Sequence, residues 1–294
     1  MQGLLMPATA GKAAQHDWAY RPQHSPLFQY YDPATDSLRD ITYPDGSQPR
    51  RIDNYVLDPE DWGHTNRTHK SKRSGSPVTG PPHGTNTRAA VLAYGVDDEE
   101  PCLVCGREGT RCFGDSCVRL FRRRMERVVL AGELRIERAD NTGTALGCGP
   151  YGVFAQVGIR EGSVVGEYLG RLHPPDRPRR LEGGYLYAFE LEGIATVDAR
   201  ECGSITRFVN HRCQPNLDVK FITYGRRKCI AFAAGRDITP GEQVFIHYGD
   251  DYFRESKPCL CDVVPYPHVP PKGSEPPWRV RSEAEQLESR PNEE

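Results

Sequence analysis

The sequence lacks any apolar run long enough to cross a membrane. A transmembrane helix needs about 20 consecutive, mostly apolar residues, and no segment of the 294-residue chain approaches that length. The first residues, Met1 to Met6, also lack the basic stretch and the long apolar core of a secretory signal peptide. We therefore expect an intracellular protein without a membrane partner.

The chain also lacks a large net charge. Its 38 basic and 40 acidic residues give a formal net charge of −2, so no overall attraction to nucleic acid is expected. A short basic run between Asn66 and Arg73 is the exception. Runs of this kind are more often solvated tails than binding patches, and we expect direct nucleic-acid binding to be weak or absent.

Proline is scarce in the middle of the chain. Eighteen of the 25 prolines lie in residues 1–100 and 251–294, whereas most apolar runs lie between about 118 and 250. One compact region with polar flanks fits this distribution better than two equal domains. We expect residues 1–100 to be irregular or partly disordered, and residues 263–294 to be a disordered tail.

The central region predicts one helix followed by short strands. Apolar residues recur at helical spacing in a helix placed at residues 119–133, which Gly132 would end. The segments that follow are short, rich in β-branched and aromatic residues, and separated by turn residues. They are residues 134–137, 151–155, 163–168, 185–190, 217–221, 228–233 and 243–248. This pattern indicates a mainly β fold built from small sheets.

Four cysteines lie close together in residues 101–118. Cys102, Cys105, Cys112 and Cys117 are separated by short loops that contain glycine. Zinc in structural sites is held by four such ligands in a tetrahedron, and a knuckle this small would depend on the metal for its folding energy. We predict a structural zinc site here. The alternative is a loop of reduced thiols, since the spacing is not among the commonest zinc-finger patterns.

A second, incomplete cysteine set lies near the end of the compact region. Cys259 and Cys261 follow the last expected strand, and Cys213 is a third candidate ligand if the chain folds back. The fourth ligand is missing from this set. His268 is one possibility, and the absence of any metal is another.

The segment from Arg207 to Asn216 is the most informative one in the chain. It places the polar pair Asn210-His211 directly after an apolar pair and shortly before Pro215, which would end a strand or a helix. Polar groups beside apolar ones suggest a buried ligand site. Taken alone, the segment could also be a hairpin loop with a hydrogen-bonded histidine.

This segment resembles the Arg-Phe-Ile/Val-Asn-His-x-Cys-x-Pro-Asn signature of SET-domain protein lysine methyltransferases. Five further segments resemble motifs of that family in the same order: 151–155, 166–170, 185–187, 197–199 and 241–248. The likeness spans about residues 134–250, and residues 251–262 resemble a reduced form of the family's post-SET cysteine segment. Cys148 and Pro150 stand where glycines are usual in the family, and Ile246 stands where an aromatic residue is common.

The resemblance implies a SET-domain fold of several small β-sheets with a C-terminal pseudoknot, preceded by the cysteine-rich zinc knuckle and the helix. In the pseudoknot the C-terminal segment threads under the loop that holds the signature. This would bring Tyr248 to Asn210.

The resemblance also implies a function. It predicts transfer of methyl groups from S-adenosylmethionine to a protein lysine ε-amine, with a histone tail or nucleosome as substrate, in a monomeric, nuclear, chromatin-associated enzyme. The alternative is a catalytically inactive SET-like module that binds chromatin or other proteins.

The resemblance assigns roles to individual residues. The tyrosines that would line a lysine channel and carry catalysis are Tyr248, Tyr168 and Tyr187. The residues that would hold the cofactor are Gly149, Pro150, Tyr151, Gly152, Tyr185, Arg207, Phe208, Asn210 and His211. Arg207 would meet the cofactor's carboxylate, and the tyrosine hydroxyl of Tyr248 would orient the amine and the methyl group.

Overall fold

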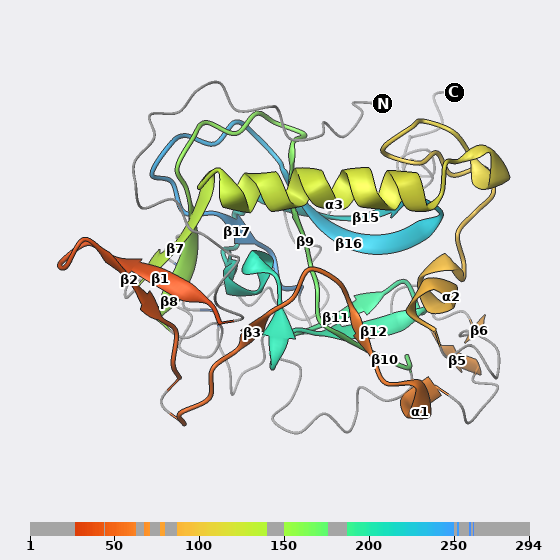
Figure 1. Cartoon of the computed structure of the whole chain (residues 1–294), viewed down its shortest axis with the longest axis horizontal. Coiled ribbons are helices and arrows are strands. Elements are labelled where there is room, and N and C mark those ends of the chain that lie inside the picture. The colour runs from red at the N-terminus through yellow and green to blue at the C-terminus, as the bar shows by residue number, and fades with distance from the viewer. Residues whose placement is uncertain are drawn as a thin grey trace, which may run out of the picture.

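The computed structural model describes residues 27–43, 45–62, 68–70, 77–79, 87–139, 150–175, 187–249, 252, 259 and 261. Figure 1 shows the whole arrangement. Within these residues no helix has the length and apolar character that a membrane span requires. The N-terminal region expected to be irregular, residues 1–100, is described only in part, and the expected tail at 263–294 falls wholly outside the described residues.

The fold is mainly β, as predicted, with several small sheets and few helices. Six sheets of two to four strands are present in the described residues. The N-terminal elements are β1 (Gln29–Asp32), β2 (Ser37–Asp40), β3 (Arg50–Arg51), β4 (Val56–Leu57), α1 (Pro59–Trp62), β5 (Thr68–Lys70), β6 (Pro77–Thr79) and α2 (Arg88–Ala93). The central elements are η1 (Gly109–Arg111), α3 (Asp115–Leu130), β7 (Leu134–Arg138), β8 (Tyr151–Ala155), β9 (Val164–Glu167), β10 (Arg171–His173), β11 (Ala188–Leu191) and β12 (Ala195–Asp198). The C-terminal elements are β13 (Cys202–Gly203), η3 (Ile205–Phe208), β14 (Asn210–His211), β15 (Leu217–Tyr224), β16 (Arg227–Ala234) and β17 (Phe245–Ile246).

The hairpin of β15 and β16 is the longest strand pair and supports α3. Its strands pair antiparallel over all eight residues of each strand. The turn residues Gly225 and Arg226 both have positive φ, 58° and 59°. In a two-residue hairpin turn this conformation matches the right-handed twist of the two flanking strands. A Cβ on Gly225 would lie 2.5 Å from the carbonyl oxygen of Gly114, so glycine allows the turn to approach the start of α3.

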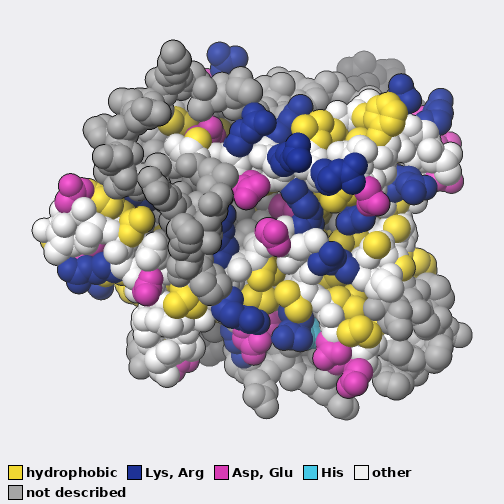
Figure 2. All heavy atoms as spheres, in the orientation of Figure 1, with side chains coloured by type: hydrophobic (Ala, Val, Ile, Leu, Met, Phe, Trp, Pro, Cys, Tyr) yellow, Lys and Arg dark blue, Asp and Glu magenta, His cyan; other side chains and the backbone are white. Residues whose placement is uncertain are grey.

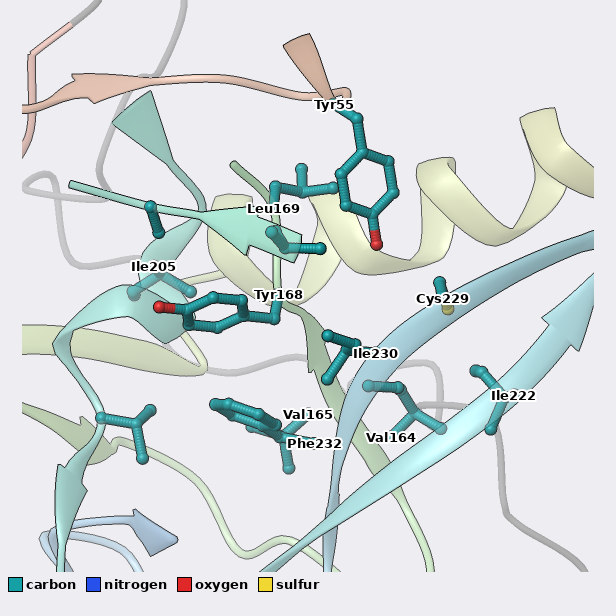
Figure 3. Close-up of a cluster of buried hydrophobic side chains, with 14 of the residues drawn as sticks. Tyr55, Val164, Val165, Tyr168, Leu169, Ile205, Ile222, Cys229, Ile230 and Phe232 are labelled. Atoms are coloured by element: carbon teal, nitrogen blue, oxygen red, sulfur yellow. The ribbon is translucent and has the colours of Figure 1, made fainter. Parts of the chain in front are cut away.

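The core lies between α3 and the three-stranded sheet β15-β16-β9. Phe121 of α3 is fully buried, and its ring stacks on Tyr224 of β15 at 4.1 Å between centroids. Figure 3 shows buried apolar side chains of β9, β15 and β16 that belong to the same core, among them Val165, Ile222 and Ile230. The carboxyl group of Glu167 lies inside this core and accepts a 2.8 Å hydrogen bond from the Tyr224 hydroxyl. Burial raises the pKa of Glu167, which the nearby Arg122 guanidinium partly offsets.

The N-terminal region differs from the irregular segment that the composition suggested. Three of its strands pair with strands that come later in the chain: β1 pairs with β7, β3 with β13 and β4 with β10, each time in parallel. Strands of two to four residues carry too little periodicity to be recognised from sequence, because their partners lie far away along the chain. Residues 27–57 are therefore a structural part of the compact domain.

The helix before the sheets begins earlier than predicted. α3 starts at Asp115, and not at residue 119, so that Cys117 of the cysteine cluster lies in its first turn. The predicted end agrees well, since Gly132 has a φ of 67°, the left-handed conformation that commonly follows a helix. The cysteine segment and the helix are thus one continuous unit.

Candidate functional site

The signature segment lies against the C-terminal strand of the domain. Asn210 and His211 form β14, which pairs in parallel with Phe245 and Ile246 of β17. The Asn216 amide donates to the backbone oxygen of Gln243 at 2.9 Å and accepts from the backbone N–H of Phe245 at 2.8 Å. The pairing that the predicted pseudoknot requires, between the signature and the segment leading to Tyr248, is therefore present.

Asn210 joins the signature to the predicted glycine turn. Its side chain is fully buried, and its Nδ2 donates to the backbone oxygen of Tyr151 at 2.8 Å. A Cβ on the neighbouring Gly152 would lie 2.3 Å from the amide nitrogen of the Gln243 side chain, so a larger residue there would require that side chain to move. The structure thus brings together two segments assigned to the cofactor. Gly149 and Tyr185, assigned with them, lie outside the described residues.

Tyr248 is held at both ends by the signature segment. Its backbone N–H donates to His211 Nδ1 at 3.1 Å, and its hydroxyl donates to the backbone oxygen of Val209 at 3.0 Å. Its ring is tilted against the His211 imidazole at 5.5 Å between centroids. The orientation of this tyrosine therefore depends directly on residues 209–211.

Tyr168 and Tyr187 are the other two predicted channel tyrosines, and they contact each other. The Tyr168 hydroxyl donates to the backbone oxygen of Tyr187 at 2.9 Å. The ring of Tyr168 is buried beside Phe189 and Phe232, with centroids 4.8 and 5.7 Å away. Tyr187 lies partly exposed over the Arg207 guanidinium. Packing and hydrogen bonding both fix this pair.

Arg207 lies in the core with its donors used by the protein. Its guanidinium donates to the backbone oxygens of Ala199 and Arg200 at 2.8 and 2.9 Å, and to the Tyr43 hydroxyl at 2.8 Å. It is 1% exposed, beside the fully buried Phe208. In this arrangement Arg207 supports the backbone around the signature. The contact with a cofactor carboxylate stays a prediction.

The first cysteine cluster has the dimensions of a tetrahedral zinc site. The sulfurs of Cys102, Cys105, Cys112 and Cys117 all lie within 4.8 Å of one another, with 3.9 Å from Cys112 to each of Cys105 and Cys117. Four thiolates about 2.3 Å from zinc would be separated by about 3.8 Å. Burial raises the pKa of the Cys105 thiol, but hydrogen bonds from the Arg107 and Phe113 amides outweigh it and bring the pKa to about 7. This donor set fits zinc.

A second cluster joins the signature to the C-terminal cysteines. His211, Cys213, Cys259 and Cys261 are all buried, and their ligand atoms lie within 4.8 Å of one another. The sulfurs of Cys213 and Cys259 are 3.7 Å apart, again close to a tetrahedral edge. The three cysteines expected from sequence are thus brought together. His268, the suggested fourth ligand, lies outside the described residues.

The hydrogen bonds of His211 indicate its role in this cluster. Because Nδ1 accepts the Tyr248 N–H, a neutral imidazole carries its proton on Nε2, which lies 3.4 Å from the Cys213 sulfur. A histidine that binds zinc through Nε2 has its proton on Nδ1 instead. In this tautomer His211 donates its Nε2 proton to the Cys213 sulfur. Its Nε2 then has no lone pair with which to bind a metal ion.

The comparisons with known proteins identify the domain. Residues 150–249 match the family model described as the SET domain. The chain is 34% identical over 119 residues to the histone-lysine N-methyltransferase TRX1 of Oryza sativa, and 36% identical over 118 residues to the histone-lysine N-methyltransferase EZH2 of Chaetomium thermophilum. These matches cover 38% and 36% of this chain, but only 12% and 8% of those proteins. The chain contains a SET domain.

A solved structure, Arabidopsis thaliana SUVH6 in complex with SAM, resembles this one over 45% of this chain and 32% of that chain. It is 24% identical in sequence, with a TM-score of 0.38.

Residues outside the SET domain also contribute to the site. Tyr43 reaches Arg207 and the Tyr187 hydroxyl from the N-terminal region. Sequence reasoning missed Tyr43, and no local signal marks it, because it lies 164 residues from Arg207 along the chain. It also missed the contact of His211 with the second cluster. The spacing His211-x-Cys213 was the available signal.

Proposed function

We propose that this chain is a protein lysine methyltransferase that uses S-adenosylmethionine. The observation that carries the proposal is the fixing of Tyr248 by the signature of a SET domain. Its backbone N–H is bonded to His211 and its hydroxyl to Val209, two residues of the segment assigned to the cofactor. One short segment can therefore position both a bound cofactor and the tyrosine hydroxyl.

The residues that would hold the cofactor lie on two segments that meet. The hydrogen bond from Asn210 to the Tyr151 backbone joins the signature to the glycine turn. Backbone groups of residues 150–152 and 208–211 are the candidates for binding the adenine and methionine parts. When bound, S-adenosylmethionine supplies an electrophilic methyl group on a positively charged sulfur.

The channel residues would prepare the lysine. A lysine amine is nucleophilic only when neutral, and its pKa in water is about 10.4. The aromatic surroundings of Tyr168, beside Phe189 and Phe232, would lower that pKa by desolvating the ammonium form. The lost proton would pass to solvent, so no strong base is required. The Tyr248 hydroxyl would orient the neutral amine, and this positioning is the main contribution to the rate.

We further propose a histone tail as the substrate and the nucleus as the site of action. The relatives named above are histone-lysine N-methyltransferases, and they match this chain over its SET domain. Both cysteine clusters would hold structural zinc, which contributes folding energy and no chemistry to the transfer.

Methyl transfer can be tested with radiolabelled cofactor and a panel of core histones and nucleosomes. We expect incorporation into a histone by the wild-type chain, and a loss of about 100-fold or more in Tyr248→Phe, since positioning terms are of this size. Tyr31→Phe is the matched control, because the Tyr31 hydroxyl donates to the exposed carboxylate of Asp36, away from the signature segment. Wild-type protein that neither binds the cofactor nor transfers methyl would leave the inactive binding module as the better explanation.

A further inference from the structure

The outer face of α3 carries a row of arginines. Arg119, Arg123 and Arg127 are exposed and follow one another at intervals of four residues, which places them on one side of the helix. A rise of 1.5 Å per residue separates successive members by about 6 Å along the axis. Figure 2 shows basic side chains gathered over the part of this face where α3 lies in Figure 1.

These charges are not neutralised within the described part of the chain. Arg119, Arg123, Arg124 and Arg127 form no ion pair there, and neither does Arg226 in the adjacent hairpin turn. Their neighbours behave differently: Arg111 pairs with Glu108, and Arg227 pairs with Asp115. A chain with a net charge of −2 therefore concentrates unpaired guanidinium groups on one surface.

We propose that this α3 arginine face, made of Arg119, Arg123, Arg124, Arg127 and Arg226, binds the phosphate backbone of double-stranded DNA without reading its sequence. Every cation in the set is a guanidinium, which can make paired hydrogen bonds to a phosphate. Neutralising several phosphates releases condensed counterions, and this release supplies the affinity of nonspecific binding. The proposal does not depend on methyl transfer.

Two apolar side chains are also exposed, Leu120 on α3 and Phe113 two residues before the helix begins. Phe113 is 57% exposed and Leu120 is 41% exposed, and Arg107 stacks over the Phe113 ring at 4.4 Å. An acidic protein surface could use both the charges and these side chains. Glu126 is the one acidic residue between Arg119 and Arg127, and the excess of arginines over acids on this stretch favours a uniform polyanion. An acidic peptide is the competitor that the experiment has to include.

The test measures binding of the full chain to a labelled duplex of about 30 base pairs by fluorescence anisotropy, across salt concentrations from about 50 to 200 mM. We expect a micromolar dissociation constant at the lowest salt. The logarithm of the binding constant should fall with the logarithm of the salt concentration with a slope of about −4, which corresponds to four to five phosphate contacts. The triple variant Arg119→Gln, Arg123→Gln, Arg127→Gln should bind at least about tenfold more weakly and lose about three units of slope.

The matched control removes three positive charges elsewhere. Arg39→Gln, Arg50→Gln, Arg160→Gln changes exposed arginines outside α3, and we expect its affinity to stay within about twofold of wild type. Thermal melting of both variants checks that each is folded. Three results would overturn the proposal: no duplex binding by wild type at the lowest salt, equal losses in the two triple variants, or binding to polyglutamate in preference to the duplex.

Discussion

The two cysteine clusters use the same chemistry at very different chain separations. The first draws its four cysteines from 16 consecutive residues and lies outside the SET domain, where the Cys102 sulfur accepts an N–H from Gly225. The second spans residues 211 to 261 and includes the histidine that holds Tyr248. The first cluster can stabilise the fold without contacting the residues proposed for methyl transfer. The second cluster links a candidate metal site to the C-terminal segment and, through His211, to the proposed catalytic tyrosine.

The largest effect on stability should come from the first cluster. Cys112→Ser would leave three thiol ligands around zinc, and metal binding supplies most of the folding energy of so small a knuckle. Since Cys117 lies in the first turn of α3, the helix would lose its N-terminal anchor. We expect the melting temperature to fall by about 10 °C or more and zinc content to fall by one atom per chain.

Cys202→Ala is the control for that measurement. Cys202 is buried at 1% exposure but belongs to neither cluster, so its truncation costs packing only. Zinc content measured by mass spectrometry should stay unchanged in this variant. A Cys112→Ser protein that keeps its full zinc content would show that the first cluster does not bind the metal.

The second cluster should show a larger effect on activity than on stability. Cys213→Ser removes the thiol that accepts from His211 Nε2, and we expect methyl transfer to fall about 100-fold as Tyr248 loses its support. The melting temperature should fall by only a few degrees, less than for Cys112→Ser. Radiolabel incorporation and calorimetry on the same samples separate the two effects.

His211→Gln tests whether the imidazole binds metal or donates to the cluster. A glutamine amide can still donate a hydrogen bond to the Cys213 sulfur, whereas it is a poor zinc ligand. The tautomer set by the Tyr248 N–H predicts that zinc content survives this change. Loss of one zinc per chain would instead make His211 the fourth ligand of the second cluster.

Chain separation also decides what could be predicted from the sequence. The signature, the glycine turn and the first cysteine cluster are local patterns, and strands β7, β8, β15 and β16 follow from short apolar segments between turns. The strands β3, β4, β10 and β13 have two or three residues each and form only because distant partners pair with them. No local pattern could place Tyr43 beside Arg207, or bring Cys259 and Cys261 to the segment that holds His211 and Cys213.

The smallest effect is expected from the ion pair between Glu242 and Arg236, which contacts Asn216 at the end of the signature segment. Glu242 accepts from the Asn216 amide at 2.9 Å and pairs with Arg236, and hydrogen bonding to Arg236 lowers the pKa of Glu242 to about 2. Because the folded state holds this carboxylate deprotonated below the ordinary pKa of about 4.5, the pair stabilises the protein fully above that value. The stabilisation should be lost as the pH falls toward 2.

Urea denaturation of wild type and Glu242→Gln at several pH values checks this expectation. At pH 6 the variant should be less stable by about 1 kcal/mol, since Arg236 is half exposed and solvent screens the pair. The difference should shrink steadily between pH 4.5 and pH 2, as the wild-type carboxyl takes up its proton. A stability difference between wild type and Glu242→Gln that stays constant with pH would mean that the contact with Asn216 depends on the shape of the Glu242 side chain and not on its charge. The loop that ends the signature would then be held without an ionic contribution.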